Sequence, residues 1–129
     1  EPLVVDQWFA VQATSQLSDT LGSVKQLLHH ECFEIRNPNK VRSLIGAYCS
    51  QNHIGFHASG GDGYEFLSDQ VLTLDKLNPQ IAARLLTPLT RWRKFDEGRQ
   101  ALMQVQLQRI KAATDLSRDV FEIVEKSTI

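Results

Sequence analysis

Apolar residues recur along almost the whole chain at the spacing of one face of an α-helix, and this periodicity limits the possible folds more than any other feature. The clearest stripe is Val41, Leu44, Ile45, Tyr48 and Cys49, which follows the i, i+3, i+4, i+7, i+8 pattern. No stretch of useful length alternates apolar and polar residues as a half-buried strand would. The pattern therefore predicts an all-α domain.

Each expected helix follows from its own apolar stripe and from start and stop signals. The expected helices cover approximately residues 3–14, 19–29, 38–49, 64–77, 79–89, 96–113 and 117–124, about seven in all, with Ser18 or Asp19 capping the second and Ser117 the last. Pro88 is expected to kink the fifth helix, because its ring displaces the hydrogen bond to the Arg84 carbonyl. The stretch from Gln51 to Gly63 is rich in glycine and has no period, so we expect a loop there.

Two Asn-Pro pairs mark helix starts. In Asn37-Pro38 and Asn78-Pro79 the asparagine can cap the helix, and proline is tolerated at the first helical position because its missing N–H costs nothing there. The pairs are 41 residues apart (37 to 78), near the roughly 40–47-residue period of HEAT and armadillo helix pairs. This spacing favours a superhelical array of antiparallel helix pairs, a HEAT- or armadillo-like α-solenoid, over a compact bundle.

The composition excludes several classes of function. A chain of 129 residues, 42% of them hydrophobic, suits one domain over residues 1–129. No apolar run approaches the ~18 residues that a membrane span needs. The 14 basic residues stand against 15 acidic ones, which leaves no positive excess for a nucleic-acid or anionic-membrane surface. We therefore expect neither a nucleic-acid nor a membrane partner.

The start of the chain suggests that it is part of a larger protein. Glu1–Val5 contains no Met and no signal peptide and leads straight into apolar helical residues, which favours a fragment of a larger protein. Such a fragment is expected to expose an apolar face.

Cys32 and Cys49 are too far apart for a Cys-x-x-Cys site, and one pair does not define a disulfide framework. Two free thiols in a reducing compartment are expected, which favours the cytoplasm.

Two histidine patterns resemble metal-binding motifs. His53 and His57 have the i, i+4 spacing of a zinc-binding helix, but they lie in the expected loop, with Gly55 between them and no Glu after the first. His30-Glu31 resembles the start of a His-Glu-x-x-His motif, but residue 34 is Glu. We therefore assign no metal ligand and no cofactor to this chain.

Two further segments resemble binding motifs. Residues 59–63 resemble a phosphate cradle, but Tyr64-Glu65 follow where a P-loop has Lys and Ser or Thr, so we expect a tight loop with glycine at positive φ. Residues 91–95 interleave basic and aromatic residues as single-strand binders do. Asp96 and Glu97 follow at once, which favours a helix end with basic residues near C-terminal carbonyls. With no nucleophile–base pair or Gly-x-Ser-x-Gly elbow, we assign no catalytic residue and expect no self-sufficient enzyme.

Arg42 and Arg84 each lie at the edge of an apolar helical stripe, and two interpretations stay open. Each guanidinium can reach past the apolar face to solvent. Alternatively, each points into a groove and binds carboxylate or carbonyl oxygens, for which its fixed fork of donors is suited. Gly46 would leave room for another chain or a ligand beside Arg42.

A series of segments then resembles one known family in order. The segments are Pro2–Ser15, Asn37–Gly46, Phe56–Ala58, Gly61–Leu67, Asn78–Gln80 and Arg84–Leu89. They are similar to the C-terminal helical domain of bacterial aminopeptidase N, the zinc alanyl aminopeptidase family, and the resemblance covers essentially the whole chain. Two places depart from the family pattern: Lys40 stands where Arg is usual, and residues 51–55 replace a segment where relatives often have Asn-Pro.

The resemblance implies that this chain is the C-terminal capping domain of a zinc-dependent metallopeptidase that removes N-terminal residues from peptides. In that family an upstream catalytic domain binds the zinc through a His-Glu-x-x-His motif, which this chain lacks. Zinc-activated water attacks the first peptide bond, with the motif Glu as general base. The C-terminal domain closes over the site as a substrate chamber, and Arg42 and Arg84 match the two arginines that face it. The implied partners are the upstream catalytic domain and peptide substrates.

A second class of function stays open beside this one. A stand-alone helical-repeat interaction module, with no catalytic role, would show the same periodicity and the same absence of catalytic residues.

Overall fold

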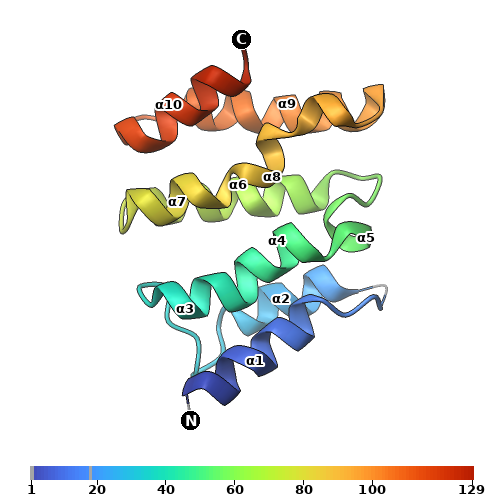
Figure 1. The fold of residues 1–129 in the computed structure, drawn as a ribbon, viewed down its shortest axis with the longest axis vertical. Helices are drawn as coiled ribbons and strands as arrows, with labels where there is room; N and C mark the ends of the chain where they lie inside the picture. Colours follow the sequence, from blue (N-terminus) through green and yellow to red (C-terminus); the bar gives the residue numbers. More distant parts are fainter. Residues whose placement is uncertain (1, 18) are drawn as a thin grey trace. The chain divides into compact units, whose positions relative to one another are not determined.

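The computed structural model describes residues 2–17 and 19–129, which form helices joined by short connections and no strand (Figure 1). The all-α prediction is therefore confirmed. Two compact units divide the chain, Glu1–Ala58 and Ser59–Ile129. One domain over residues 1–129 stays a prediction.

The first unit is built around three stretches of helix and one short turn of helix. Its elements are α1 (Pro2–Ala13), α2 (Thr20–Leu27), then α3 (Pro38–Val41), the π-helix η1 (Arg42–Gly46) and α4 (Ala47–Gln51) in one continuous run, and finally α5 (His53–Phe56). α1 packs against α2 and η1. The fully buried side chains Val24, Leu44 and Ile45 lie on the apolar stripes that the periodicity predicted. In α1 the predicted stripe of Leu3, Val4, Trp8 and Val11 is exposed, and the helix buries Phe9 and Ala13 on its other side instead.

The second unit has a comparable core. Its elements are α6 (Asp62–Asp75), α7 (Pro79–Leu85), α8 (Thr87–Thr90), the 3-10 helix η2 (Trp92–Lys94), α9 (Glu97–Lys111) and α10 (Arg118–Ser127). α6 packs against α7 and α9, and α10 packs against the same two helices. Leu67, Val71, Met103, Leu107 and Val124 are all fully buried.

Both Asn-Pro pairs start helices as predicted. The Asn37 Oδ1 atom accepts hydrogen bonds from the backbone N–H groups of Asn39 and Lys40, at 3.0 and 3.4 Å. The Asn78 Oδ1 atom accepts one from the Ile81 N–H at 3.3 Å. In both helices the proline occupies the first turn, where its missing donor costs nothing.

Pro88 interrupts the fifth expected helix, which confirms the predicted kink. α7 ends at Leu85 and α8 begins at Thr87, immediately before the proline. Pro88 has no N–H to donate to the Arg84 carbonyl. That carbonyl accepts a hydrogen bond from the Thr87 hydroxyl instead, at 3.0 Å.

The prediction of a loop from Gln51 to Gly63 is wrong at both ends. α5 occupies His53–Phe56, because the Asn52 side chain accepts a hydrogen bond from the Gly55 N–H at 2.9 Å and so caps a single turn. α6 begins at Asp62, since its first turn carries two carboxylates that favour a helix N-terminus. The predicted positive φ is found at Gly61, at +80°.

The other helix starts are mostly as expected. The Asp96 and Ser117 side chains cap α9 and α10 by accepting hydrogen bonds from the backbone three residues ahead. Ser18 lies outside the described residues. Asp19 precedes α2, but its side chain makes no capping hydrogen bond, so the predicted cap is wrong there, and α2 ends at Leu27 rather than near residue 29. Each expected helix has a counterpart, and α5 and the 3-10 helix η2 are additional.

The basic and aromatic segment 91–95 lies against the end of another helix. The Trp92 Nε1–H and an Arg93 guanidinium N–H both donate to the Ser127 carbonyl of α10, at 2.9 and 3.2 Å. The Arg93 guanidinium also lies 4.3 Å from the centre of the Trp92 ring. Arg93 therefore does lie near C-terminal carbonyls, but those at the end of α10 rather than of its own helix.

Candidate functional site

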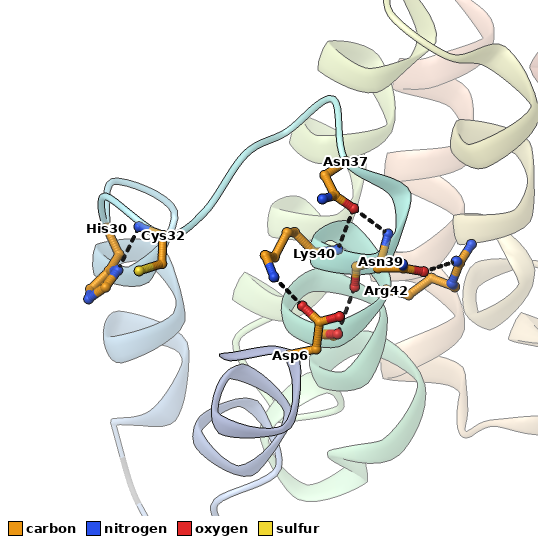
Figure 2. Close-up of polar contacts among 8 residues, drawn as sticks. Asp6, His30, Cys32, Asn37, Asn39, Lys40 and Arg42 are labelled. Carbon is orange, nitrogen blue, oxygen red and sulfur yellow. Dashed lines mark hydrogen bonds and ion pairs between the residues drawn. The ribbon is translucent and has the colours of Figure 1, made fainter. Parts of the chain in front are cut away.

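Arg42 lies at the start of η1 with its side chain exposed. Its Nη2 atom donates a hydrogen bond to the Asn39 Oδ1 atom, one turn earlier, at 2.5 Å. Figure 2 shows Arg42 extending away from α1, whereas its neighbour Lys40 turns toward Asp6 of that helix. The Asn39 amide thus holds an exposed guanidinium and leaves its remaining N–H groups available to a ligand.

The helical geometry is unusual at this point. The Ala47 N–H donates to the Arg42 carbonyl five residues back, so η1 is a π-helical turn inserted between α3 and α4. Single π turns rotate the side chains that follow by an extra residue and occur frequently at functional sites. The turn leaves Arg42 on the exposed side while Leu44 and Ile45 stay fully buried.

The sequence does not predict that Lys40, in the same segment, is buried. Its Nζ atom lies 2.5 Å from the Asp6 Oδ1 atom, and the two side chains are only 10% and 15% exposed. The pair ties the first turn of the Asn-Pro helix to α1 (Figure 2). Lys40 thus serves packing within the first unit.

Arg84 lies in the last turn of α7 and is also exposed. It lines an open groove of about 420 Å³ between α7 and α10. Gln80 and Ala83 share the α7 wall, and the α10 wall carries Arg118, Asp119, Glu122 and Ile123. Arg118 is paired with Glu122 on its own helix, with 3.1 Å between Nε and Oε1.

The two predicted arginines belong to different units, Arg42 to the first and Arg84 to the second. Among the described residues, neither guanidinium forms an ion pair with a carboxylate. Because arginine is always charged, each guanidinium can bind an external oxygen ligand through the donors that no internal group occupies.

His53 and His57 flank the single turn of α5. Their rings stack nearly in parallel, with centroids 6.2 Å apart. His30 follows α2, and its Nδ1 atom accepts a hydrogen bond from the Cys32 N–H at 3.0 Å (Figure 2). Within residues 2–17 and 19–129, no three His, Cys, Asp or Glu side chains lie together as a metal site would require.

Several side chains have pKa values moved by their surroundings, each for a structural reason. Burial raises the pKa of the Cys49 thiol far above its usual range. Burial also raises the pKa of Tyr64, against the lowering effect of Arg99. The pKa of Asp96 is lowered, chiefly by the hydrogen bonds that it accepts from Arg99. These groups support packing and capping, so no acid–base catalytic pair emerges from them.

The sequence patterns also do not predict the contacts of two buried polar residues. Asn52 is 4% exposed, and its amide group donates to the Ala13 and Ser15 carbonyls at 3.0 and 2.8 Å. Asp75 is 7% exposed and accepts hydrogen bonds from the backbone N–H and the hydroxyl of Ser117, which joins α6 to α10. Their partners are about 40 residues away in the sequence, which no local pattern can indicate.

The whole chain, residues 1–129, matches the family described as "Domain of unknown function (DUF3458_C) ARM repeats". The chain belongs to this ARM-repeat family. The predicted solenoid class is thereby confirmed. No helix of the ARM-repeat domain, within its described residues, combines the length and hydropathy that crossing a bilayer requires.

Relatives of this ARM-repeat domain include aminopeptidases. Aminopeptidase N of Haemophilus influenzae is 44% identical over 125 residues, which are 97% of this chain and 14% of the relative. Aminopeptidase N of Escherichia coli is 43% identical over the same shares, and that of Caulobacter vibrioides is 43% identical over 98% of this chain and 15% of the relative. The predicted resemblance to aminopeptidase N is confirmed.

A solved structure agrees with these sequence relatives. The crystal structure of Legionella pneumophila aminopeptidase A in complex with aspartic acid matches 99% of this chain with a TM-score of 0.92 and 39% identity. The match covers 15% of that protein's chain. The ARM-repeat domain thus spans only about a seventh of the length of its relatives.

Proposed function

We propose that this ARM-repeat domain is the C-terminal domain of a zinc-dependent aminopeptidase, a metallopeptidase that removes N-terminal residues from peptides. The observation that carries this proposal is the 44% identity to aminopeptidase N over 97% of the chain. The two free cysteines support the cytoplasm as the compartment, since disulfides are rare there.

The residues of this part of the polypeptide do not form a site for the zinc of the proposed enzyme. The described residues bring no three metal-ligating side chains together. When bound in an upstream catalytic domain, zinc would activate the water that attacks the peptide bond. The ARM-repeat domain would contribute no metal ligand and no proton-transfer group.

The proposed role of the domain is to cap the catalytic site and shape a chamber that admits peptides and excludes folded proteins. Arg42 and Arg84 would face this chamber. Both side chains are exposed and neither is neutralised by a carboxylate among the described residues. A guanidinium binds a carboxylate or carbonyl through paired hydrogen bonds, so each arginine suits a peptide substrate.

Arg84→Ala tests the proposed contact with substrate. In the longer enzyme we expect kcat/KM for a peptide to fall about tenfold, as the loss of one charge-assisted hydrogen bond predicts, while Tm changes little. Arg109→Ala is a control for the peptide kinetics alone, because Arg109 lies on α9 outside the groove but forms an ion pair with Asp69, with 2.6 Å between Nη2 and Oδ1. A fall in Tm of several degrees with unchanged peptide kinetics would instead show that Arg84 is a structural residue.

Selection by size tests the proposed chamber. We expect the longer enzyme to release N-terminal residues from short peptides and from an unfolded chain, but not from the same chain when folded. Equal cleavage of the folded chain would contradict the capping role. Absence of any peptidase activity, combined with capture of a protein partner by the domain, would favour the stand-alone interaction module.

A further inference from the structure

The groove between α7 and α10 carries opposite charges on its two walls. Arg84 lies on the α7 wall, and Asp119 and Glu122 lie on the α10 wall. All three residues are exposed. Within the part of the chain that the structure describes, Arg84 forms no ion pair with either carboxylate. The groove therefore keeps a positive side and a negative side.

The two carboxylates of the α10 wall differ in how far they are already engaged. Glu122 accepts a hydrogen bond from Arg118, four residues earlier on the same helix. The Asp119 side chain forms no ion pair and no hydrogen bond with residues 2–17 and 19–129. A cation in the groove would interact more strongly with Asp119, because Arg118 partly neutralises Glu122.

This distribution of charge disfavours ligands of a single sign. An anionic ligand that filled the groove would lie against Arg84 but also against Asp119, which repels it. A cationic ligand would meet the reverse problem. A ligand with one charge of each sign is attracted by both walls, so the groove is complementary to a zwitterionic group.

Apolar side chains line the groove between its charged groups. Ala83 of α7 and Ile123 of α10 provide this surface, and Ala83 is only 8% exposed. The volume of about 420 Å³ lies in the range of about 300–1,000 Å³ that is typical of ligand sites. An aliphatic stem can pack on such a surface while the charge at its end reaches a polar partner.

We propose that this groove binds the C-terminal residue of a peptide substrate and favours lysine or arginine at that position. Such a residue combines a terminal carboxylate, a long aliphatic stem and a side-chain cation. The Arg84 guanidinium donates paired hydrogen bonds to the terminal carboxylate, and the Asp119 carboxylate binds the side-chain cation. The stem lies against Ala83 and Ile123.

This inference rests on the proposed function and names the substrate class of the same site. An aminopeptidase engages the N-terminus of a peptide at its catalytic centre, so the C-terminal end of that peptide is available to a second site. Arg84 then acts as a specificity residue for the C-terminal carboxylate, and Asp119 as one for the side chain beside it.

Peptides that differ only at the C-terminal residue test the proposal in the longer enzyme. Three of them end in lysine, alanine or glutamate with a free carboxylate, and a fourth ends in lysine amide; all have alanine at the N-terminus and equal length. We expect kcat/KM for the lysine acid to exceed that for its amide about tenfold, as one lost charge-assisted pairing predicts. We expect it to exceed that for the alanine acid about threefold, as an exposed ion pair predicts. The glutamate acid should be the poorest of the three free acids.

Two variants assign these preferences to the two walls. Arg84→Ala should abolish the preference for acid over amide, and Asp119→Asn should abolish the preference for lysine over alanine. Glu125→Gln is the matched control for Asp119→Asn, because Glu125 is an exposed carboxylate of α10 that does not line the groove. Ratios of kcat/KM between peptides are compared within one variant, so a smaller folded fraction does not change them. Equal kcat/KM for all four peptides would overturn the proposal, and so would preferences that persist in both variants.

Calorimetric titration measures binding without turnover. The same peptides, acetylated at the N-terminus, offer no free amino group for cleavage. Tighter binding of the lysine acid than of its amide, lost in Arg84→Ala, would support the proposal. Equal affinity of the acid and the amide would overturn it.

Hydrolysis of an alanyl anilide separates this inference from the proposed function, because the anilide has no peptide C-terminus. Anilide turnover without any preference among the four peptides would refute the groove assignment alone. A protein that cleaves neither the anilide nor the peptides, but binds the acetylated lysine acid through Arg84, would refute the proposed enzyme and leave the groove assignment intact.

Discussion

Lys40 and Asp6 are 34 residues apart in the sequence and form a largely buried ion pair. Lys40→Ala would leave the Asp6 carboxylate nearly buried without its partner, and we expect unfolding free energy to fall by about 3 kcal/mol. Lys40→Arg keeps the charge and should be tolerated much better. Thermal and urea unfolding of the longer protein measure both effects.

A surface pair provides the control for that prediction. Arg118 and Glu122 are 89% and 56% exposed, so Arg118→Ala should change stability by less than about 0.5 kcal/mol. An equal loss for Lys40→Ala and Arg118→Ala would show that the Asp6 pair is no stronger than a surface pair.

The two cysteines should differ sharply in reactivity. Cys32 is exposed, whereas Cys49 is buried and burial raises the pKa of its thiol. Because the folded pKa of Cys49 lies above the unfolded value of about 8.5, this group stabilises the fold fully below that pH and progressively less above it. At neutral pH we expect maleimide to modify Cys32 rapidly and Cys49 only after unfolding, as peptide mass spectrometry can show. Rapid native modification of Cys49 would contradict the buried placement.

At the scale of the elements, Asn52 links the end of α1 to the start of α5. Its side chain donates to the Ala13 and Ser15 carbonyls and accepts from the Gly55 N–H. Asn52→Ala leaves these buried groups without partners, so we expect a loss of about 2 kcal/mol in unfolding free energy. Faster hydrogen exchange at Gly55 should accompany it. Unchanged exchange there would show that α5 does not depend on this cap.

The start of α9 should be sensitive to pH. Asp96 accepts hydrogen bonds from Arg99, which lower the pKa of its carboxyl. Its stabilising effect is therefore present above the unfolded pKa of about 3.9 and is lost as pH falls through the lower folded value. Asp96→Asn should lower Tm near neutral pH, and the difference from the unchanged protein should disappear in acid. A constant difference at every pH would exclude the carboxylate as its cause.

The periodic stripes and cap residues predicted most of the helices. Asn37, Asn78, Asp96 and Ser117 all start helices, and Pro88 breaks one, because these effects depend on residues within one turn. α5 escaped prediction because four residues are too few to show a period, and its cap depends on the Asn52 side chain. The π turn at Arg42–Gly46 likewise has no sequence signature.

The candidate site was predictable only in part. Helical wheels place Arg42 and Arg84 at the edges of apolar stripes, and both side chains are exposed. The groove beside Arg84 depends on the packing of α10 against α7, and the pairing of Lys40 depends on α1. Such contacts are decided by tertiary packing between distant segments, which local patterns do not contain.

At the scale of the whole molecule, the proposed aminopeptidase domain is supported by its relatives and not by its own composition. The identity to aminopeptidase N covers nearly all of this chain, yet only 14% of the relative's length. The proposed enzyme therefore needs the remaining polypeptide for zinc binding and for peptide cleavage.

The most direct measurement compares the longer protein with the 129-residue chain in one experiment. Metal content and alanyl anilide turnover are determined for both preparations under the same conditions. We expect stoichiometric zinc and turnover in the longer protein, and neither in residues 1–129. Zinc bound stoichiometrically by the 129-residue chain, turnover by that chain, or a longer protein without zinc and without activity would contradict the assignment to a zinc aminopeptidase.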